Sequence, residues 1–314
     1  MKKPNYISPG KFSTTFFDEI LRSKEFDDIY FSSENGQKES DHVFISGNHL
    51  KEIMPNSKNF IIGELGFGTG LNFLLTWKLF KELKIKDGYL DYISIEGYPL
   101  MKNQMNKVHE KHPNLQKLWV ELQDALPPLW SGIHRLNLNH GKVRLTLIYN
   151  DVLEALKNSI FKADAWFLDG FSPNKNHDMW SLEVMSEVYR LTKPSGTFAT
   201  FSSAGFVRRN LEKAGFDVKK IKGYNFKKEM SCGQKPGMEK SKEKFTKVVI
   251  VGGGVAGASI ASSLRKRGYD PIVIEKNNKL AQGSSGNLAA VQHPRLTTVT
   301  VSYTHLRAHE TLLY

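Results

Sequence analysis

Two glycine-rich loops carry the residues of this 314-residue chain that are best suited to chemistry. The first reads Gly63-Glu64-Leu65-Gly66-Phe67-Gly68-Thr69-Gly70, and the second reads Gly252-Gly253-Gly254-Val255-Ala256-Gly257. Each follows a short apolar run, and glycines at such a turn let the backbone tighten and approach a ligand closely. The sequence therefore predicts two nucleotide-cofactor sites on two domains, and hence two coupled reactions.

Three carboxylates are expected near the first loop. Glu64 lies within it, Glu96 ends the next apolar run, and Asp151 follows a third run. A carboxylate at a strand end can accept hydrogen bonds from both ribose hydroxyls, which is the role predicted for Glu96, whereas Asp151 is placed to meet an adenine edge. A negative charge at Glu64 suits a cationic sulfonium better than a pyrophosphate, which favours S-adenosylmethionine over NAD. The predicted cofactor-binding residues of this site are Glu64, Gly66, Gly68, Gly70, Glu96 and Asp151.

The segment 168–180 reads Leu-Asp-Gly-Phe-Ser-Pro-Asn-Lys-Asn-His-Asp-Met-Trp and follows a fourth apolar run. A carboxylate, an aromatic ring and a turn stiffened by proline together form a platform that can bind a base and orient an amine. We therefore predict Asp169 and Phe171 as the catalytic residues. The structural alternative is an ordinary strand end, followed by a helix that is capped by Asp178.

The second loop has the GxGxxG spacing at Gly252, Gly254 and Gly257. It stands between a predicted strand and a predicted helix, as the dinucleotide fingerprint requires. Pyrophosphate would bind at the N-terminus of the helix, and Glu275, at the end of the next strand, suits a pair of ribose hydroxyls. This pattern alone leaves FAD and NAD open.

Alternating strands and helices are predicted to position these loops. Strands are expected at 60–65, 90–96, 143–150, 165–168 and 196–202, and helices at 71–83, 100–109, 152–159, 179–191 and 206–214. This alternation predicts an α/β fold with a Rossmann-like, doubly wound parallel sheet that binds ligands at the carboxyl ends of its strands. A further βαβ unit begins at Lys247. Before residue 60 we expect a helix at 16–26, a hairpin turn at Asn35-Gly36 and a strand at 41–45.

The composition limits the class of protein. The formal net charge of +12 favours an anionic partner, either nucleic acid or a membrane surface, although plain solubility also accounts for it. Cys232 is the single cysteine, which rules out an internal disulfide and fits a reducing cytoplasm. No stretch approaches the roughly 20 apolar residues of a membrane span, so we expect a cytosolic protein with no membrane partner. His305 and His309 lack a third ligand, and no metal site is predicted.

Together these motifs resemble the bacterial bifunctional MnmC family, which builds 5-methylaminomethyl-2-thiouridine at the wobble position of tRNA. The resemblance runs from about 26 to 296 and is carried by the motifs at 26–32, 35–36, 64–73, 95–100, 169–180 and 227–230. His177 departs from it, because the family usually has proline there. The resemblance implies an S-adenosylmethionine-dependent methyltransferase that methylates the amine of 5-aminomethyl(-2-thio)uridine in tRNA. An FAD-dependent domain would first remove the carboxymethyl group from 5-carboxymethylaminomethyluridine.

The resemblance also predicts the domain organisation. We expect a methyltransferase domain at 1–226, a basic linker at 227–246, a truncated FAD-binding Rossmann fragment at 247–297 and a non-native tail at 298–314. The lysine-rich linker is either a solvated spacer or a strip that touches phosphates. The segment 283–287 resembles a phosphate-side loop of amino-acid-oxidase-type flavoproteins, which favours FAD. We expect the oxidative step to be lost through truncation. The alternative is an FAD-dependent tRNA-modifying oxidoreductase whose first domain mainly binds tRNA.

Overall fold

The structure, a computed structural model, describes residues 12–13, 22–23, 26–29, 36–225, 227–237, 247–265 and 269–286. The chain divides into two compact units, residues 1–242 and 243–314, and each is described here by itself. The predicted tail at 298–314, with His305 and His309, lies outside the described residues. Within the described part, no helix is both long and apolar enough to cross a membrane.

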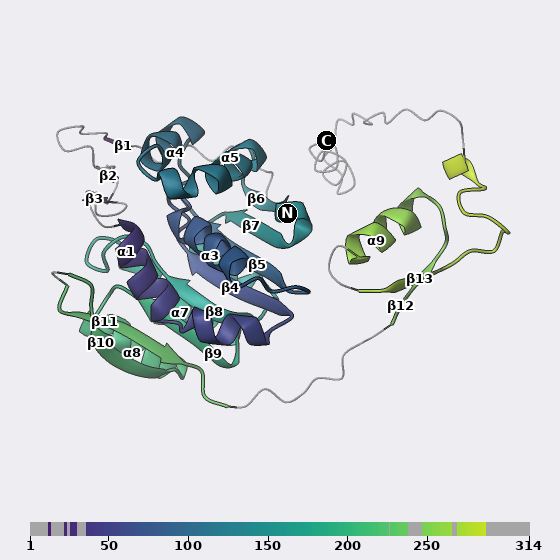
Figure 1. The fold of residues 1–314 in the computed structure, drawn as a ribbon. Helices are drawn as coiled ribbons and strands as arrows, with labels where there is room; N and C mark the ends of the chain where they lie inside the picture. Colours follow the sequence, from purple (N-terminus) through teal and green to yellow (C-terminus); the bar gives the residue numbers. More distant parts are fainter. Residues whose placement is uncertain are drawn as a thin grey trace, which may run out of the picture. The chain divides into compact units, whose positions relative to one another are not determined.

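An eight-stranded sheet forms the centre of the first unit, with the strand order β10-β11-β9-β8-β4-β5-β7-β6 (Figure 1). The five inner strands are parallel: β4 (Asn59–Leu65), β5 (Tyr89–Glu96), β7 (Val143–Tyr149), β8 (Ala163–Leu168) and β9 (Thr192–Thr200). The chain moves outward from β4 to β5 and β7, then returns to the other side of β4 to form β8 and β9. The predicted doubly wound sheet is therefore confirmed, and its topological switch point lies between β4 and β8.

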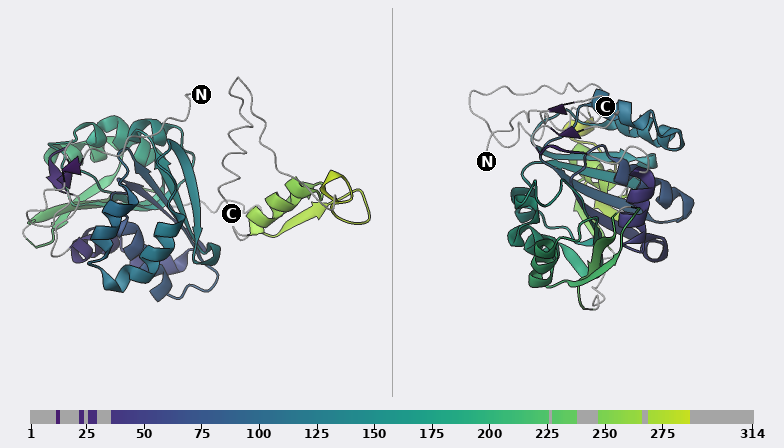
Figure 2. Two further views of the ribbon diagram at one scale, coloured as in Figure 1. Left: turned by 90° about the horizontal axis from the view of Figure 1, so that it is seen from above. Right: turned by 90° about the vertical axis from the view of Figure 1, so that its left-hand side faces the viewer.

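Helices cover both faces of this sheet (Figure 2). One apolar core joins the sheet to α3 (Leu71–Glu82), α4 (Lys102–His109) and α5 (Gln116–Ala125), and the other joins it to α6 (Val152–Lys157), α7 (Leu182–Arg190) and α8 (Gly205–Ala214). Neighbouring residues of β8 alternate between the two cores, so that Trp166 packs in one and Phe167 in the other, both fully buried. Inner strands buried on both faces read as near-continuous apolar runs, which explains why the sequence revealed them.

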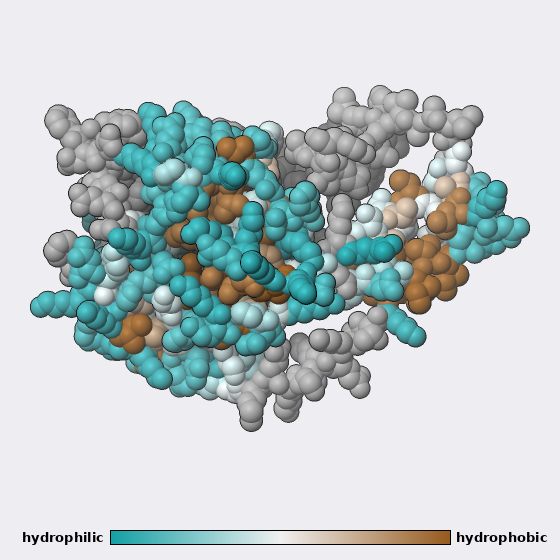
Figure 3. Space-filling view, viewed as in Figure 1, coloured by the Kyte–Doolittle hydropathy of each residue, from teal (hydrophilic) through white to brown (hydrophobic). Residues whose placement is uncertain are grey.

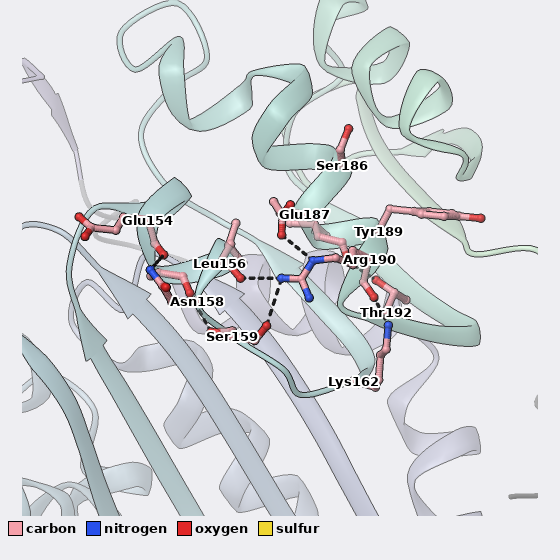
Figure 4. A network of polar contacts seen from close by, with 12 residues as sticks. Glu154, Leu156, Asn158, Ser159, Lys162, Ser186, Glu187, Tyr189, Arg190 and Thr192 are labelled. Carbon is pink, nitrogen blue, oxygen red and sulfur yellow. Dashed lines mark hydrogen bonds and ion pairs between the residues drawn. The ribbon is translucent and has the colours of Figure 1, made fainter. Parts of the chain in front are cut away.

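Arg190 ties α7 to the end of α6 (Figure 4). Its guanidinium Nη2 donates to the carbonyl oxygens of Leu156 at 2.8 Å and Ser159 at 3.1 Å, while Nε donates to the Glu187 carboxylate at 2.7 Å. The last carbonyls of a helix have no partner within the helix. One side chain therefore provides a donor to two carbonyls at and just beyond the C-terminus of α6.

Three antiparallel strands that flank the parallel strands were not predicted. They are β6 (Gly132–Leu138), β10 (Asp217–Lys222) and β11 (Glu229–Gln234). The last of these corrects the predicted linker, because β11 lies inside the sheet between β9 and β10. Met230 and Ser231 of β11 are buried. The lysines on either side of this strand led to the prediction of an unstructured linker. Residues 238–246 of the predicted linker lie outside the described residues.

The segment before β4 also differs from its prediction. The strands β1 (Phe12–Ser13), β2 (Arg22–Ser23) and β3 (Asp28–Ile29) form a small sheet, so the predicted helix is wrong at residues 22–23. The remainder of that helix and Asn35 lie largely outside the described residues. Gly36 begins α1 (Gly36–Ser40), which continues as the π-helix η1 (Asp41–Ser46) where a strand was expected. The ring of Phe44 stacks on Phe167 of β8 at 5.1 Å, so burial of this apolar run against the sheet outweighs its strand propensity.

Short helical turns complete the first unit. They are α2 (Leu50–Ile53), η2 (Met54–Asn56), η3 (Pro113–Leu115), η4 (Asn139–Gly141) and η5 (Asp178–Trp180). The helix predicted at 179–191 is in fact η5 followed by α7. Ser181, rather than Asp178, caps α7, because its Oγ accepts a hydrogen bond from the Val184 amide at 3.4 Å.

The second unit contains β12 (Val248–Val251), α9 (Val255–Arg265), β13 (Pro271–Ile274) and the turn η6 (Ser284–Gly286). The two strands pair in parallel, which confirms the predicted βαβ unit. Apolar side chains gather on its surface, brown in Figure 3. They include Val249, Val251, Ile272, Ile274 and Leu280, all exposed. A unit with so much apolar surface exposed is expected to be marginally stable by itself.

Candidate active site

A cavity of about 750 Å³ opens at the carboxyl ends of β4, β5 and β8, which is the switch point of the sheet. Six of the residues predicted for the first site line it: Gly66, Gly68, Glu96, Asp151, Asp169 and Phe171. It is also lined by residues to which the sequence analysis gave no role, among them Phe26, Asp28, Glu39, Asn72, Phe201 and Lys227. The fold thus brings the glycine loop and the segment 168–180 into one site.

The glycine loop has the left-handed backbone that only glycine adopts easily. The φ angles of Gly66, Gly68 and Gly70 are +80°, +52° and +77°. A Cβ atom on Gly66 would lie 3.4 Å from the Gly170 Cα atom, so the loop passes close to the segment after β8. Gly70 does not line the cavity: it caps α3, and a Cβ atom there would lie 2.9 Å from the Phe67 ring. Gly70 therefore shapes the turn without contacting the cavity.

Glu96 faces the cavity at the end of β5. Its Oε2 accepts a hydrogen bond from the Gly68 amide at 2.8 Å, and its Oε1 accepts one from the Tyr98 amide at 2.7 Å. Burial raises the pKa of this carboxyl, and the amide hydrogen bonds oppose that change. The Phe67 backbone amide also stabilises the charged form. A carboxylate has about four acceptor positions, so one remains for the predicted contact with a ribose hydroxyl. Asp151 lines the cavity and also caps α6, because its Oδ1 accepts from the Glu154 amide at 3.0 Å.

The structure corrects the prediction for Glu64. Its side chain is fully buried behind the loop and does not line the cavity. Its carboxyl accepts hydrogen bonds from Ser94 Oγ at 2.7 Å and from Asn72 Nδ2 at 3.0 Å. Burial raises the pKa of Glu64 to about 8, so the carboxyl is largely uncharged at pH 7. It therefore lacks both the charge and the position that a contact with a sulfonium requires.

Asp169 stands at the end of β8 beside the glycine loop. Its Oδ1 accepts a hydrogen bond from the Gly170 amide at 2.8 Å, and its Oδ2 accepts one from Asn72 Nδ2 at 2.7 Å. Burial raises the pKa of Asp169 to about 6, against the opposing effects of Gly170, Asn72 and Lys227. At pH 7 the group is therefore mostly ionised, yet it is a stronger base than an ordinary aspartate.

An aromatic pair covers one side of the cavity. The rings of Phe26 and Phe171 stack at a centroid distance of 4.6 Å and an interplanar angle of 23°. The Ser172 amide donates to Asp28 Oδ2 at 2.8 Å, which holds the segment around Phe26 on the loop after β8. A base that stacks on Phe171 would extend this existing pair. The motif that contains Phe26 contributed to the family resemblance, but nothing in it indicated this contact.

Lys227 and Glu39 form an ion pair at the rim of the cavity. Lys227 Nζ lies 2.7 Å from Glu39 Oε1 and 4.7 Å from the centre of the Phe201 ring. The two residues are far apart in the sequence, and Lys227 was assigned to the predicted linker. The only signal for Lys227 was its place in the Lys227-Lys228-Glu229-Met230 motif.

The predicted site of the second unit has the geometry of a dinucleotide loop. Gly252 has a φ angle of +100°, and a Cβ atom on Gly257 would lie 1.9 Å from the Gly252 carbonyl oxygen. Only glycine permits this close packing of helix on loop. Glu275 Oε2 accepts from the Gly253 amide at 2.7 Å, and this hydrogen bond is the main reason why the pKa of Glu275 is lowered. At Gly254 a Cβ atom would lie 2.9 Å from Ser285 Oγ.

Comparisons with known proteins agree with this division of the chain. Residues 113–236 match a family described as S-adenosyl-L-methionine-dependent methyltransferase, and residues 247–311 match a family described as FAD dependent oxidoreductase. Two bifunctional proteins named for tRNA 5-methylaminomethyl-2-thiouridine biosynthesis, MnmC, are similar to the chain. The protein from Marinomonas sp. (strain MWYL1) is 38% identical over 95% of this chain and 48% of its own length. That from Aliivibrio fischeri is 40% identical over 87% of this chain and 44% of its own length.

The chain belongs to the MnmC family. It spans about half the length of the curated MnmC relatives that it matches. A crystal structure of MnmC2 from Aquifex aeolicus shares the fold, with a TM-score of 0.56 and 24% identity over 74% of this chain and 73% of that one. The methyltransferase match ends at residue 236, beyond β11, which agrees with the place of β11 in the sheet. The oxidoreductase match includes residues 298–311 of the predicted tail.

Proposed function

We propose that the first unit is an S-adenosylmethionine-dependent methyltransferase that acts on tRNA. Its proposed substrate is the amine of 5-aminomethyl(-2-thio)uridine at the wobble position, and its product is 5-methylaminomethyl(-2-thio)uridine. The observation that carries this proposal is that Asp169 and the loop of Gly66 and Gly68 line one cavity at the switch point of the sheet. Membership in the MnmC family and the net charge of +12 favour tRNA as the partner, and a cytoplasmic location is proposed with it.

The residues of the cavity fit the cofactor. The positive φ angles at Gly66 and Gly68 leave room for close approach, and Glu96 lines the same cavity, which supports its proposed contact with ribose hydroxyls. When bound, S-adenosylmethionine supplies a methyl group on a positively charged sulfur. The amine nitrogen uses its lone pair to form a bond to the methyl carbon, while the carbon–sulfur bond breaks and its electron pair stays on sulfur. The nitrogen then releases one proton, which Asp169 is placed to accept or pass to water.

Asp169 orients the amine first and acts as a base second. An alkylammonium has a pKa of about 10.4, whereas the pKa of Asp169 is about 6, so full proton transfer from the ammonium remains uphill by about four units. An ordinary aspartate would face a gap of roughly six units. Orientation of the nitrogen in line with the carbon–sulfur bond can supply up to about 7–11 kcal/mol in favourable cases. We therefore expect most of the effect of Asp169 to come from positioning.

Nucleoside mass spectrometry of modified tRNA tests the proposal. The purified protein and S-adenosylmethionine are incubated with tRNA carrying 5-aminomethyluridine, or with tRNA carrying 5-carboxymethylaminomethyluridine. We expect a gain of one methyl group on the first substrate, and a single-turnover rate at least about a hundredfold lower in Asp169→Ala. A wild-type rate in Asp169→Ala, at equal occupancy of the cofactor site, would remove Asp169 from the mechanism. Absence of methyl transfer by the wild-type protein would refute the function.

The second unit supports a second candidate function, that of an FAD-dependent tRNA-modifying oxidoreductase whose first unit mainly binds tRNA. The packing of Gly257 on Gly252 and the hydrogen bond from Gly253 to Glu275 favour a dinucleotide at this loop. Absorbance of the purified protein near the flavin bands tests it, with Gly257→Leu as the variant that blocks the loop. Flavin that copurifies with the wild type, together with conversion of the carboxymethylated substrate, would favour this candidate. A colourless protein that methylates the first substrate would count against it.

A further inference from the structure

Asn72 lies between the carboxyl groups of Glu64 and Asp169. It is in the first turn of α3 and is 9% exposed. Its side-chain Nδ2 donates one hydrogen bond to Glu64 at 3.0 Å and another to Asp169 at 2.7 Å. Its Oδ1 accepts a hydrogen bond from the buried hydroxyl of Ser40. Each polar atom of the amide is therefore engaged.

These partners permit one orientation of the amide. If the group were rotated by half a turn, its oxygen would face the charged carboxylate of Asp169, and its nitrogen would face Ser40. The hydrogen bond to Asp169 would be lost, and oxygen would be placed against a charged oxygen, which is costly in a buried site. The shorter of the two donated bonds goes to Asp169, as expected for the carboxyl group that carries charge at pH 7.

We propose that Asn72 is a positioning residue for methyl transfer, which holds the Asp169 carboxylate so that its remaining lone pairs face the cavity and the amine. This role rests on the proposed function of the first unit. Glu64 lies on the side of Asn72 away from the cavity. It accepts a hydrogen bond from the second N–H of the Asn72 amide, and this contact keeps the amide plane directed at Asp169. Gly170 fixes the second oxygen of Asp169 through its backbone amide. Side chains from α3 and β4 and a backbone amide after β8 thus set the direction of one carboxylate.

Other charged or titratable groups also face Asp169, and the test must hold them constant. Lys227 and Glu39 line the same cavity, and Lys227 lowers the pKa of Asp169 while Glu39 raises it. Glu64 and Tyr92 lie behind it, and their ionisation is coupled to the charge on Asp169. A substitution at Asn72 leaves these four groups in place.

Asn48 provides a matched control for Asn72. It is also a buried asparagine with three side-chain hydrogen bonds, and it does not line the cavity. Its Nδ2 donates to the carbonyl oxygens of Phe44 at 3.0 Å and Trp166 at 3.2 Å, and its Oδ1 accepts from Thr197 at 2.7 Å. Asn48→Ala and Asn72→Ala therefore remove similar numbers of buried hydrogen bonds, but only the second touches Asp169.

The experiment measures the pH profile of single-turnover methyl transfer to tRNA carrying 5-aminomethyluridine for the wild type, Asn72→Ala and Asn48→Ala. In Asn72→Ala we expect the rate at pH 7 to fall about tenfold or more and the acid limb to move upward by about one pH unit, because Asp169 loses a donor to its charged form. The KM for S-adenosylmethionine should change less than about twofold, since Asn72 acts on the amine side. Asn48→Ala should lower stability and keep the wild-type acid limb.

Three results would overturn the role of Asn72. A folded Asn72→Ala protein with the wild-type rate and acid limb would show that Asp169 is positioned without it. An equal loss of rate in both variants, with no shift of the acid limb, would show a general packing effect. Absence of transfer by the wild type would overturn the proposed function and this role together, whereas either of the first two results leaves the function standing.

Discussion

Replacement of Glu64 by glutamine is expected to stabilise the first unit at neutral pH. The carboxyl is fully buried, and burial raises its pKa from 4.5 to about 8. Glutamine has nearly the same shape and no charge to desolvate. Its amide can accept from Asn72 and donate to Ser94 Oγ, which already lie at 3.0 Å and 2.7 Å from the carboxyl oxygens. The substitution therefore removes the ionisation and keeps the packing.

The size of the effect follows from the linkage between ionisation and folding. Because the folded pKa of Glu64 is raised, its contribution to stability is complete below about pH 4.5 and is lost as the pH rises through about 8. Between pH 5 and pH 7 the unfolded carboxyl is mostly ionised while the folded one stays mostly protonated, so each of these two pH units costs up to about 1.4 kcal/mol. We expect the wild type to lose about 2–3 kcal/mol between pH 5 and pH 7 through this group, and Glu64→Gln to lose none of it.

Urea unfolding followed by tryptophan fluorescence measures this difference. All five tryptophans lie in the first unit, so the signal is independent of the second. At pH 5 we expect similar free energies of unfolding for both proteins. At pH 7 the variant should be more stable by about 2–3 kcal/mol. If the two free energies change in parallel between pH 5 and pH 7, Glu64 does not have a raised pKa and the reasoning is refuted.

Three further predictions address the site and the fold. The single-turnover methylation rate should fall below about pH 6, where Asp169 takes up a proton, and Asp169→Asn should remove that limb; a limb that persists would assign it to another group. Gly66→Ala should weaken S-adenosylmethionine binding about tenfold or more by calorimetry, because alanine is strained at a φ of +80°, and unchanged affinity would place the cofactor elsewhere. Arg190→Ala should lower the free energy of unfolding by about 1–3 kcal/mol, since it leaves the carbonyls of Leu156 and Ser159 without this donor; a change below about 0.5 kcal/mol would contradict the role.

The inner part of the fold could be predicted because its strands are buried on both faces. β4 and β8 read as apolar runs, and each ends at a polar loop, which locates the carboxyl edge of the sheet. Edge strands lack this signal. β6 alternates exposed and buried residues, and β10 is almost wholly exposed and rich in lysine. For β11, short length and flanking lysines concealed a strand that is completed only by pairing with β9.

Those residues of the candidate site that directly follow a predicted strand in the sequence could be predicted. Glu96 and Asp169 each follow an apolar run, so their place at the carboxyl edge was readable. The contact between Asn72 and Asp169 depends on the pairing of β4 with β8, which no local pattern reveals. The pair formed by Lys227 and Glu39 depends in addition on the antiparallel return of β11. For Glu64 the sequence showed a carboxylate in the loop, but only the packing of β4 decides that it points away from the cavity.

The division of charge between Glu64 and Asp169 explains why one site contains two neighbouring carboxyl groups. Full ionisation of both would place two negative charges on one amide, so burial keeps the proton on Glu64, whose pKa is about 8, and leaves the charge on Asp169, whose pKa is about 6. The charged group is the one that lines the cavity, and the neutral group is the one that does not. Of this pair, only Asp169 therefore presents a carboxylate to a cationic amine that enters the cavity, and its direction is defined by Asn72 and Gly170. Because an ammonium beside Asp169 would lower the pKa of that carboxyl further, binding of the substrate should strengthen this division.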